Sequence, residues 1–239
     1  TKIGKRVMWL IPWMVMGGAD KFNLDAIAGL NKKGYENYVL TTLINDNDWK
    51  QKFEEYTDEI FCMADFMDPS RYIEFVAYFI QSRQIDVMVV TNSYDGYYML
   101  PWLRMHFPEL VIVDYIHMEE WYWKAGGHAR ASSAQNGISE KTFVCNNMID
   151  GEDIIKKSNI IVEDFKRTEE PLFINIGRHD EKQKKLTRII KAAEILSKEY
   201  KFKILFIGDG KDTEKYKKVV KEKNLENIII FLGRKQNPY

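Results

Sequence analysis

Short apolar runs alternate with amphipathic stretches along the first half of the chain. Runs typical of strands buried in a sheet occur at 6–13, 38–43, 60–63, 87–91 and 110–116. Between them, apolar residues recur at helical spacing from Phe22 to Leu30, over 72–82 and over 97–106, with Pro101 expected near the start of the last helix. This alternation predicts a mostly parallel sheet with helices on both of its faces.

The same alternation returns on a smaller scale from residue 172 onward. Strands are predicted at 172–176, 203–207 and 227–232, and helices with one apolar face at 186–196 and 214–223. The run at 172–176 is almost entirely apolar and is predicted to be a buried parallel strand. This βαβαβ order is one half of a doubly wound sheet.

The segment between the two halves has no hydrophobic period. Residues 125–139 are rich in Gly and Ser and predict a loop, 141–146 predict one more strand, and a charged linker is expected from Met148 to about residue 170. We therefore place the domain boundary at Asn146 and Asn147, which gives domains 1–146 and 147–239. The predicted fold class is α/β with two Rossmann-like lobes, of which the second is incomplete.

Charge and cysteine content narrow the classes of partner and location. The 239 residues include 35 Lys or Arg and 35 Asp or Glu, so no net field points to nucleic acid. From Asp150 onward basic residues exceed acidic ones by five, which favours an anionic ligand on the second half. Cys62 and Cys145 lie far apart and indicate a reducing, cytoplasmic location. The apolar run from Trp9 to Met16 is too short to span a bilayer, so the protein is expected to be soluble or peripheral on a membrane.

The strongest candidate for chemistry follows the strand at 172–176. Ligands of open α/β sheets bind outside the carboxyl ends of the strands, where this chain has Gly177 and Arg178 and then a lysine cluster. Gly177 permits a close turn, Arg178 offers a planar fork of donors, and Lys184 or Lys185 adds a compact charge, which together suit a diphosphate. A strand-to-helix turn with solvated basic residues explains the same pattern about as well.

Two further candidates lie in the first half. Gly17 and Gly18 stand where a strand meets a helix, so their N–H groups could face an anion, although Gly-Gly pairs are also common loop devices. His117 ends a strand and precedes two glutamates and three aromatic residues within 119–123, a composition that suits a sugar ring and its hydroxyl groups. A helix packed by its aromatic residues is the alternative explanation.

Asp46, Asn47 and Asp48 form a D-x-D sequence after the second strand. Such a pair of carboxylates can hold a divalent metal against a nucleotide diphosphate. Turns rich in Asn and Asp are far commoner than metal sites, so no metal site is predicted.

Several of these segments resemble the retaining glycosyltransferases of the GT-B fold, called group 1 or family 4, a group that contains bacterial mannosyl- and capsule-building transferases. FINIGRHDEKQKKLTRIIKAAEIL is similar to that family's strand, Gly-Arg, loop, Lys and helix, and KILFIGDGKDTEKYKKVV followed by IIIFLGR continues the pattern. MGGADKFNLDAIAGLNKKGYENYVLTT is similar to its Gly-Gly-Ala-acid loop and following helix, and His117 stands where members carry a strand-end histidine.

The resemblance implies a site for a nucleotide sugar such as a UDP- or GDP-sugar, used as substrate without a further cofactor or a metal. Arg178 and Lys184 would hold the diphosphate and carry catalysis with His117, which would line the sugar site. The loop is one residue longer than the family pattern and leaves Lys182 and Lys185 as rivals of Lys184. Binding positions are then expected at Gly17, Gly18, Gly177, Arg178, Lys184 and Gly208. The implied acceptor is a glycan or a lipid-linked molecule, in polysaccharide biosynthesis in the cytoplasm or at the inner face of the membrane.

The chain also departs from the family pattern. A second half-sheet after the Phe-Leu-Gly strand, and a helix and strand near 146–147, are missing, which predicts a truncated or spliced chain. The outer edge of the strand at 172–176 would then be unpaired, and we expect it to pair with the first sheet or with a second copy in a homodimer. A nucleotide-binding module without transfer activity stays an alternative. A nicotinamide-cofactor enzyme is disfavoured, because neither Gly17-Gly18 nor Gly208-Asp209-Gly210 completes a G-x-G-x-x-G pattern.

Overall fold

The computed structural model describes residues 5–117, 151–160 and 169–237. The chain divides into two compact units, Thr1–Met148 and Ile149–Tyr239, and each is described by itself. The junction lies outside the described residues, as do the predicted loop at 125–139 and strand at 141–146, so the predicted boundary stays a prediction. Among the described residues, no helix is long and apolar enough to cross a membrane.

The first unit contains a five-stranded parallel sheet in the order β3-β2-β1-β4-β5. Its strands are β1 (Arg6–Ile11), β2 (Glu36–Thr41), β3 (Glu59–Cys62), β4 (Val87–Thr91) and β5 (Val111–Tyr115). Leu10 of β1 pairs with Leu40 on one side and with Val90 on the other, so the strands end at a common edge. The predicted parallel sheet is confirmed.

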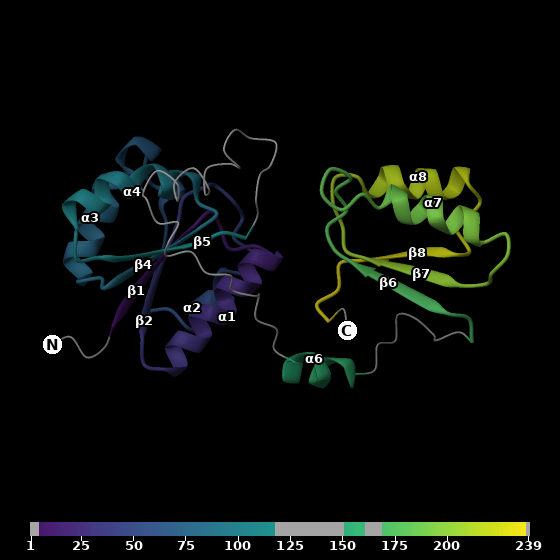
Figure 1. Ribbon diagram of the computed structural model, residues 1–239, viewed down its shortest axis with the longest axis horizontal. Coiled ribbons are helices and arrows are strands. Elements are labelled where there is room, and N and C mark those ends of the chain that lie inside the picture. Colours follow the sequence, from purple (N-terminus) through teal and green to yellow (C-terminus); the bar gives the residue numbers. More distant parts are fainter. Residues whose placement is uncertain (1–4, 118–150, 161–168, 238–239) are drawn as a thin grey trace, which may run out of the picture. The chain divides into compact units, whose positions relative to one another are not determined.

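Helices cover both faces of this sheet, as predicted (Figure 1). They are α1 (Gly18–Lys32), α2 (Lys50–Glu54), α3 (Tyr72–Arg83) and α4 (Tyr94–His106), with short 3-10 turns η1 (Met63–Asp65) and η2 (Pro69–Arg71). α1 and α2 pack on the face that carries Trp9, and α3 and α4 pack on the face that carries Met8.

α4 begins earlier than the sequence predicts, and Pro101 therefore lies in its interior and not near its start. The Ser93 side chain accepts a hydrogen bond from the Gly96 N–H at 3.1 Å, which caps the helix at this earlier point. The N-cap bond fixes the start, and the packing of Leu100 and Leu103 on the sheet outweighs the hydrogen bond that Pro101 cannot donate.

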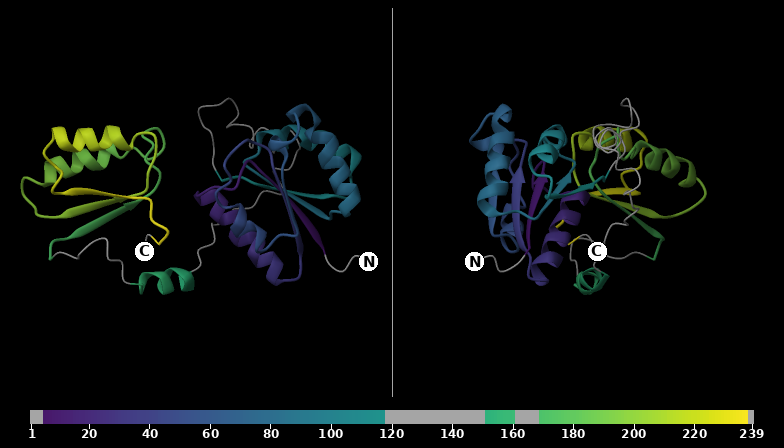
Figure 2. Two further views of the ribbon diagram at one scale, coloured as in Figure 1. Left: turned by 180° about the vertical axis from the view of Figure 1, so that it is seen from behind. Right: turned by 60° about the vertical axis from the view of Figure 1, so that its left-hand side comes forward.

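The second unit contains a parallel sheet in the order β6-β7-β8. Its elements are α6 (Gly151–Ser158), β6 (Leu172–Ile176), α7 (Thr187–Leu196), β7 (Lys203–Ile207), α8 (Thr213–Glu222) and β8 (Ile229–Gly233). α7 and α8 lie on the same side of the sheet in every view (Figures 1 and 2). Phe206 of β7, Ile190 of α7 and Tyr216 of α8 form the centre of the core between them and are fully buried.

One prediction for the second unit is wrong. β6 is not buried: Phe173, Ile174 and Ile176 are 58%, 54% and 51% exposed. β6 pairs only with β7 among the described strands. Its exposed residues lie on both faces: Ile174 and Ile176 on one, and Phe173 on the face where α7 and α8 pack over β7. The expected linker contains α6, in which the charges favour a helix, because Asp153 near its start pairs with Lys157 one turn later.

Candidate functional site

The carboxyl end of β6 brings Gly177, Arg178 and Lys184 together. The Gly177 N–H donates to the Ile207 carbonyl of β7 at 2.9 Å, which continues the sheet pairing one residue beyond β6. The chain then turns back, and Cε of Lys184 lies 3.9 Å from the point where a Cβ at Gly177 would stand. Arg178 follows this glycine along the chain and the Lys184 side chain lies beside it, and their role in binding a diphosphate stays a prediction.

Arg178 and Lys184 carry charges that the surrounding residues leave unneutralised. Neither side chain has a carboxylate within ion-pair distance among the residues that the structure describes. Some other cations of this unit are paired: Lys211 lies 2.9 Å from Asp180, and Lys223 lies 2.6 Å from Glu194. An anion that reaches Arg178 and Lys184 does not have to displace an internal partner.

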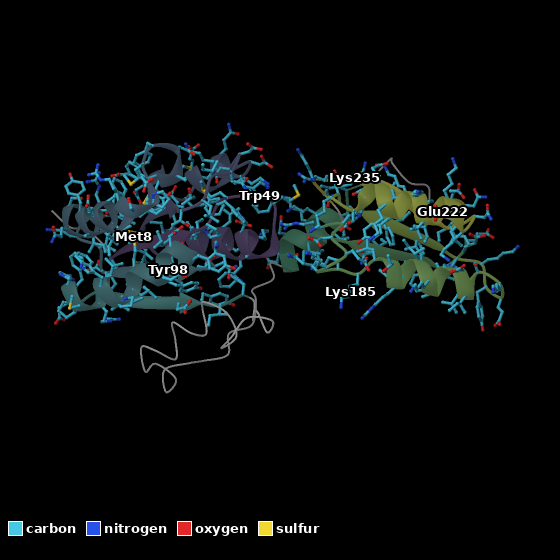
Figure 3. All side chains as sticks on the ribbon, turned by 90° about the horizontal axis from the view of Figure 1, so that it is seen from above. Met8, Trp49, Tyr98, Lys185, Glu222 and Lys235 are labelled. Atoms are coloured by element: carbon cyan, nitrogen blue, oxygen red, sulfur yellow. The ribbon has the colours of Figure 1, made fainter. Side chains whose placement is uncertain are left out.

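The three candidate lysines are all exposed and differ in what their side chains approach. Lys185 ends the loop in the left-handed region at φ 51° and is exposed (Figure 3). Lys182 is exposed as well. Of the three side chains, that of Lys184 comes within 4 Å of a Cβ at Gly177, so the geometry favours Lys184.

The acidic residues of the same loop are held by partners other than Arg178 and Lys184. The hydrogen bond from Lys211 lowers the pKa of Asp180 and keeps it ionised. Glu181 accepts hydrogen bonds from the Tyr216 hydroxyl at 2.9 Å and from the Thr187 hydroxyl. Burial acts to raise the pKa of Glu181, but these hydrogen bonds outweigh it and the pKa is lowered. Glu181 thus joins the loop to α7 and α8, and Asp180 joins it to the turn before α8.

Close contact with the β7–α8 turn explains the glycines of that turn. A Cβ at Gly208, which has φ +133°, would lie 2.0 Å from the Gly177 carbonyl oxygen. A Cβ at Gly210 would lie 2.4 Å from the carbonyl oxygen of His179. The backbone is tied across the same contact, because the His179 N–H donates to the Asp209 carbonyl at 2.9 Å. Gly208 thus lies at the predicted site, where it allows the β7–α8 turn to support the β6–α7 loop.

His179 lies beneath this loop and is fully buried. Its ring has edge contacts with Phe206, Tyr216 and Phe231. Burial lowers the pKa of the His179 imidazole, an effect that the Asp209 carboxylate opposes and Lys217 reinforces. The imidazole is therefore neutral at neutral pH.

The second unit should lose stability as the pH falls from about 7.5 to about 5.5. A histidine whose pKa is lowered by folding binds its proton more readily in the unfolded chain, so its contribution is complete above the unfolded pKa of about 6.5 and is lost below it. Calorimetry of the parent and of His179→Leu checks this, because the variant should have a flatter pH profile for the second unit. Three carboxylates also have a lowered pKa, those of Asp180, Glu181 and Asp209. Their protonation is expected to reduce the stability of the second unit only below about pH 4. Identical profiles for parent and variant would contradict the assignment.

In the first unit, Gly17 caps α1 in an extended conformation and Gly18 begins the helix. The Asp20 carboxylate folds back over this end, and one of its oxygens lies 2.8 Å from the position of a Cβ at Gly17. Asp20 itself is buried. A carboxylate at the positive end of a helix competes with any added anion, so the pair of glycines is better suited to a neutral hydroxyl group than to a phosphate.

His117 lies at the carboxyl edge of the same sheet, beyond β5. Its ring packs edge-on against Phe22 of α1, with ring centres 5.1 Å apart, so His117 and the α1 end share one region. Burial lowers the pKa of its imidazole, and Nε2 has no hydrogen-bond partner among the described residues. The ring is therefore neutral at neutral pH, and its Nε2 is buried beneath the surface of this edge. The acidic and aromatic residues at 119–123 lie outside the described residues.

The D-x-D sequence has a structural explanation. Asn47 is buried at φ 51°, and its amide oxygen accepts a hydrogen bond from the Met14 N–H at 2.9 Å. Asp46 and Asp48 on either side are exposed. Within the described ranges, no group of three or more His, Cys, Asp or Glu side chains is placed to hold a metal ion.

Several polar residues of both edges were not singled out from the sequence. In the first unit the Asn23 amide and the Thr91 hydroxyl are buried and 3.1 Å apart, which links α1 to β4. In the second, His179, Asp209 and Thr213 form a chain of hydrogen bonds. The sequence shows only that these are polar residues near a strand end or a helix start. Residues that cap an ordinary helix have the same pattern, so the sequence alone does not distinguish the two.

One known protein family matches part of the chain, within the second unit. Residues 156–238 match the family model of Glycosyl transferases group 1, and this range contains every element from β6 to β8. A search of curated proteins finds no match to the chain.

Solved structures with the same fold are similar over nearly the whole chain. The apo form of lipopolysaccharide outer core galactosyltransferase WaaB has 15% identity and a TM-score of 0.64, and the match covers 98% of this chain and 69% of that one. Anabaena Alr3699/HepE in complex with UDP has 16% identity and a TM-score of 0.66, with 97% and 70% covered. UDP-GlcNAc 2-epimerase from Neisseria meningitidis, bound to UDP-GlcNAc, has 12% identity and a TM-score of 0.62, with 97% and 72% covered. This likeness establishes the fold, two Rossmann-like lobes of the GT-B type, and confirms the predicted fold class.

Proposed function

We propose that this chain, whose residues 156–238 form a group 1 glycosyl transferase domain, transfers a sugar from a nucleotide-sugar donor to an acceptor with retention at the anomeric carbon. The observation that carries the proposal is the pair of cations at the carboxyl end of β6. Arg178 and Lys184 flank Gly177 and are without a carboxylate partner among the described residues. A diphosphate supplies the negative charge that this arrangement lacks.

The chemistry follows from where charge develops. As the bond between the anomeric carbon and the diphosphate breaks, the electron pair stays on the leaving phosphate oxygen. Fixed cations at Arg178 and Lys184 stabilise that growing charge more strongly than the charge of the ground state, and this difference lowers the barrier. His117 is the residue we assign to the sugar site, where its neutral imidazole would hold a hydroxyl group. Gly17 and Gly18 are assigned to acceptor binding, at an edge that Asp20 makes unfavourable for phosphate.

The fold by itself does not decide between transfer and other reactions of nucleotide sugars, since the epimerase has it too. The acceptor that we propose is a glycan or a lipid-linked molecule, and the location is the cytoplasm or the inner face of the membrane. The outer edge of β6, which no described strand pairs with, supports the prediction of a homodimer. A nucleotide-binding module without turnover remains the second candidate, supported by the small sheet of the second unit.

Thermal unfolding with UDP, GDP or ADP, each in EDTA and in magnesium, tests the proposal. At a hundred times the dissociation constant a ligand adds about 2.7 kcal/mol of stability to the second unit. Arg178→Ala should weaken the stabilising nucleotide about ten- to a hundredfold, because it removes charge-assisted hydrogen bonds worth about 1.5–3 kcal/mol. The matched control is Arg188→Ala, which removes the same charge from an exposed position on α7.

Several outcomes would contradict the proposal. Equal losses in Arg178→Ala and Arg188→Ala would point to a general charge effect and not to a site. Stabilisation that needs magnesium would argue against a diphosphate held by arginine and lysine alone. If a nucleotide binds, its UDP- or GDP-sugar is incubated with and without a glycan acceptor, and NMR of the anomeric proton reports retention or inversion. Conversion of the sugar without an acceptor would favour epimerisation, and no conversion would favour the binding module.

A further inference from the structure

His179 directly follows Arg178, and its hydrogen bonds determine which ring nitrogen carries the proton. The Asp209 carboxylate can only accept, so the Thr213 hydroxyl donates to it at 2.7 Å. The Thr213 oxygen then accepts from the Gly210 N–H at 3.0 Å and from Nδ1 of His179 at 2.9 Å. His179 is therefore the tautomer with a proton on Nδ1.

The other ring nitrogen has no such partner. Nε2 is buried and makes no hydrogen bond among the described residues, and the ring is surrounded by Phe206, Tyr216 and Phe231. Leaving a buried acceptor unpaired is unfavourable. An apolar side chain of similar size would suit these aromatic neighbours better, so packing gives no reason for a histidine here. The hydrogen bond from Nδ1 to Thr213 explains why a histidine is present at this position.

That hydrogen bond connects the cationic loop to the start of α8. Thr213 is the first residue of α8, and Asp209 lies in the turn between β7 and α8. The backbone of His179 is joined to the same turn through the Asp209 carbonyl at 2.9 Å and the Asp212 N–H at 3.2 Å. The hydrogen bond from the His179 ring to Thr213 adds a third connection. It fixes the orientation of His179, which is adjacent to Arg178 in the chain.

We propose that His179 is a positioning residue for nucleoside diphosphate binding: its Nδ1–H, held by Thr213 and through it by Asp209, sets the orientation of the loop that carries Arg178 and Lys184. The ligand identity rests on the proposed function. His179 does not contact the ligand, and its effect passes through the main chain to Arg178.

Two substitutions at position 179 separate positioning from packing. His179→Leu removes the donor and the unpaired acceptor together, so the unfolding midpoint should stay or rise while the affinity for the nucleotide that stabilises the parent falls on the order of tenfold. His179→Asn places an amide N–H near the position of Nδ1 and should bind within about twofold of the parent. Thr213→Val should resemble His179→Leu, and the double variant should be no weaker than either single variant.

The alternatives give distinct results. Unchanged affinity in His179→Leu, with Arg178→Ala still impaired, overturns this inference and leaves the proposed function intact. Affinity and stability that fall together in His179→Leu and are not restored by His179→Asn show a purely structural role and also overturn it. Failure of the parent to bind UDP, GDP or ADP refutes both. A readout without ligand is the ¹⁵N spectrum of the imidazole, in which a proton on Nδ1 is expected and a proton on Nε2 would refute the connection.

Discussion

Replacing Gly208 by alanine is expected to lower the stability of the second unit by about 3 kcal/mol or more. At φ +133° an L side chain is strained, and the new Cβ would stand 2.0 Å from the Gly177 carbonyl oxygen and 2.9 Å from its carbon. Both atoms belong to the backbone, so no side-chain rotation relieves the overlap. The β6–α7 loop has to move, and nucleotide affinity should fall with stability.

Two other glycines separate strain from overlap. Gly233→Ala keeps a positive φ of +68° but meets open space, so its cost should be about 1 kcal/mol. Gly210→Ala has no positive φ but places a Cβ 2.4 Å from the His179 carbonyl oxygen, and it should fall between the other two. Circular dichroism follows both units, whereas tryptophan fluorescence follows the first alone, because all six tryptophans lie at or before residue 123. Equal losses in Gly208→Ala and Gly233→Ala would refute the backbone overlap.

Phe79→Ala should destabilise the first unit by about 3–5 kcal/mol, the cost of a large cavity in a packed core. Phe79 of α3 is 1% exposed, and its ring centre lies 5.6 Å from those of Tyr38 and Phe61. The Arg83 guanidinium lies over the same ring at 5.3 Å. Truncation leaves these groups without a common partner at the centre of one face of the sheet.

The adjacent residue is the matched control. Tyr78 is on the same helix but 62% exposed, so Tyr78→Ala should change stability by less than about 0.5 kcal/mol. Denaturant titration followed by tryptophan fluorescence measures both, since Trp9 is buried on the opposite face of the sheet. A loss below about 1 kcal/mol for Phe79→Ala would mean that this side of the core is loosely packed.

The sequence predicts an element well where local pattern and tertiary environment agree. The strands at 87–91 and 203–207 have the predicted bounds, because each is an apolar run between turn residues and each lies between two other strands. The burial of β6 could not be read in the same way. Its residues are as apolar as those of β7, but their exposure depends on whether another element covers them. The hydrophobic period of the sequence does not show whether such an element is present.

The residues of the candidate site also differ in how far the sequence predicts their contacts. Gly177, Arg178 and Lys184 are close in sequence, so a strand followed by a turn is enough to predict that they meet. His179 and Thr213 are 34 positions apart, and their contact depends on the packing of two loops. The sequence pattern is enough to select the candidate cations, whereas the contacts that support their loop require the tertiary structure.

Among the described strands, β6 is joined to its sheet along one edge only, and the cationic loop continues directly from it. A local opening that breaks the β6–β7 ladder can therefore release the strand and the loop together while β7 and β8 stay folded. The β6–β7 contacts then determine both the stability of this sheet edge and the fraction of molecules in which the candidate site is assembled. A ligand held by Arg178 and Lys184 would in turn keep the edge of the sheet closed.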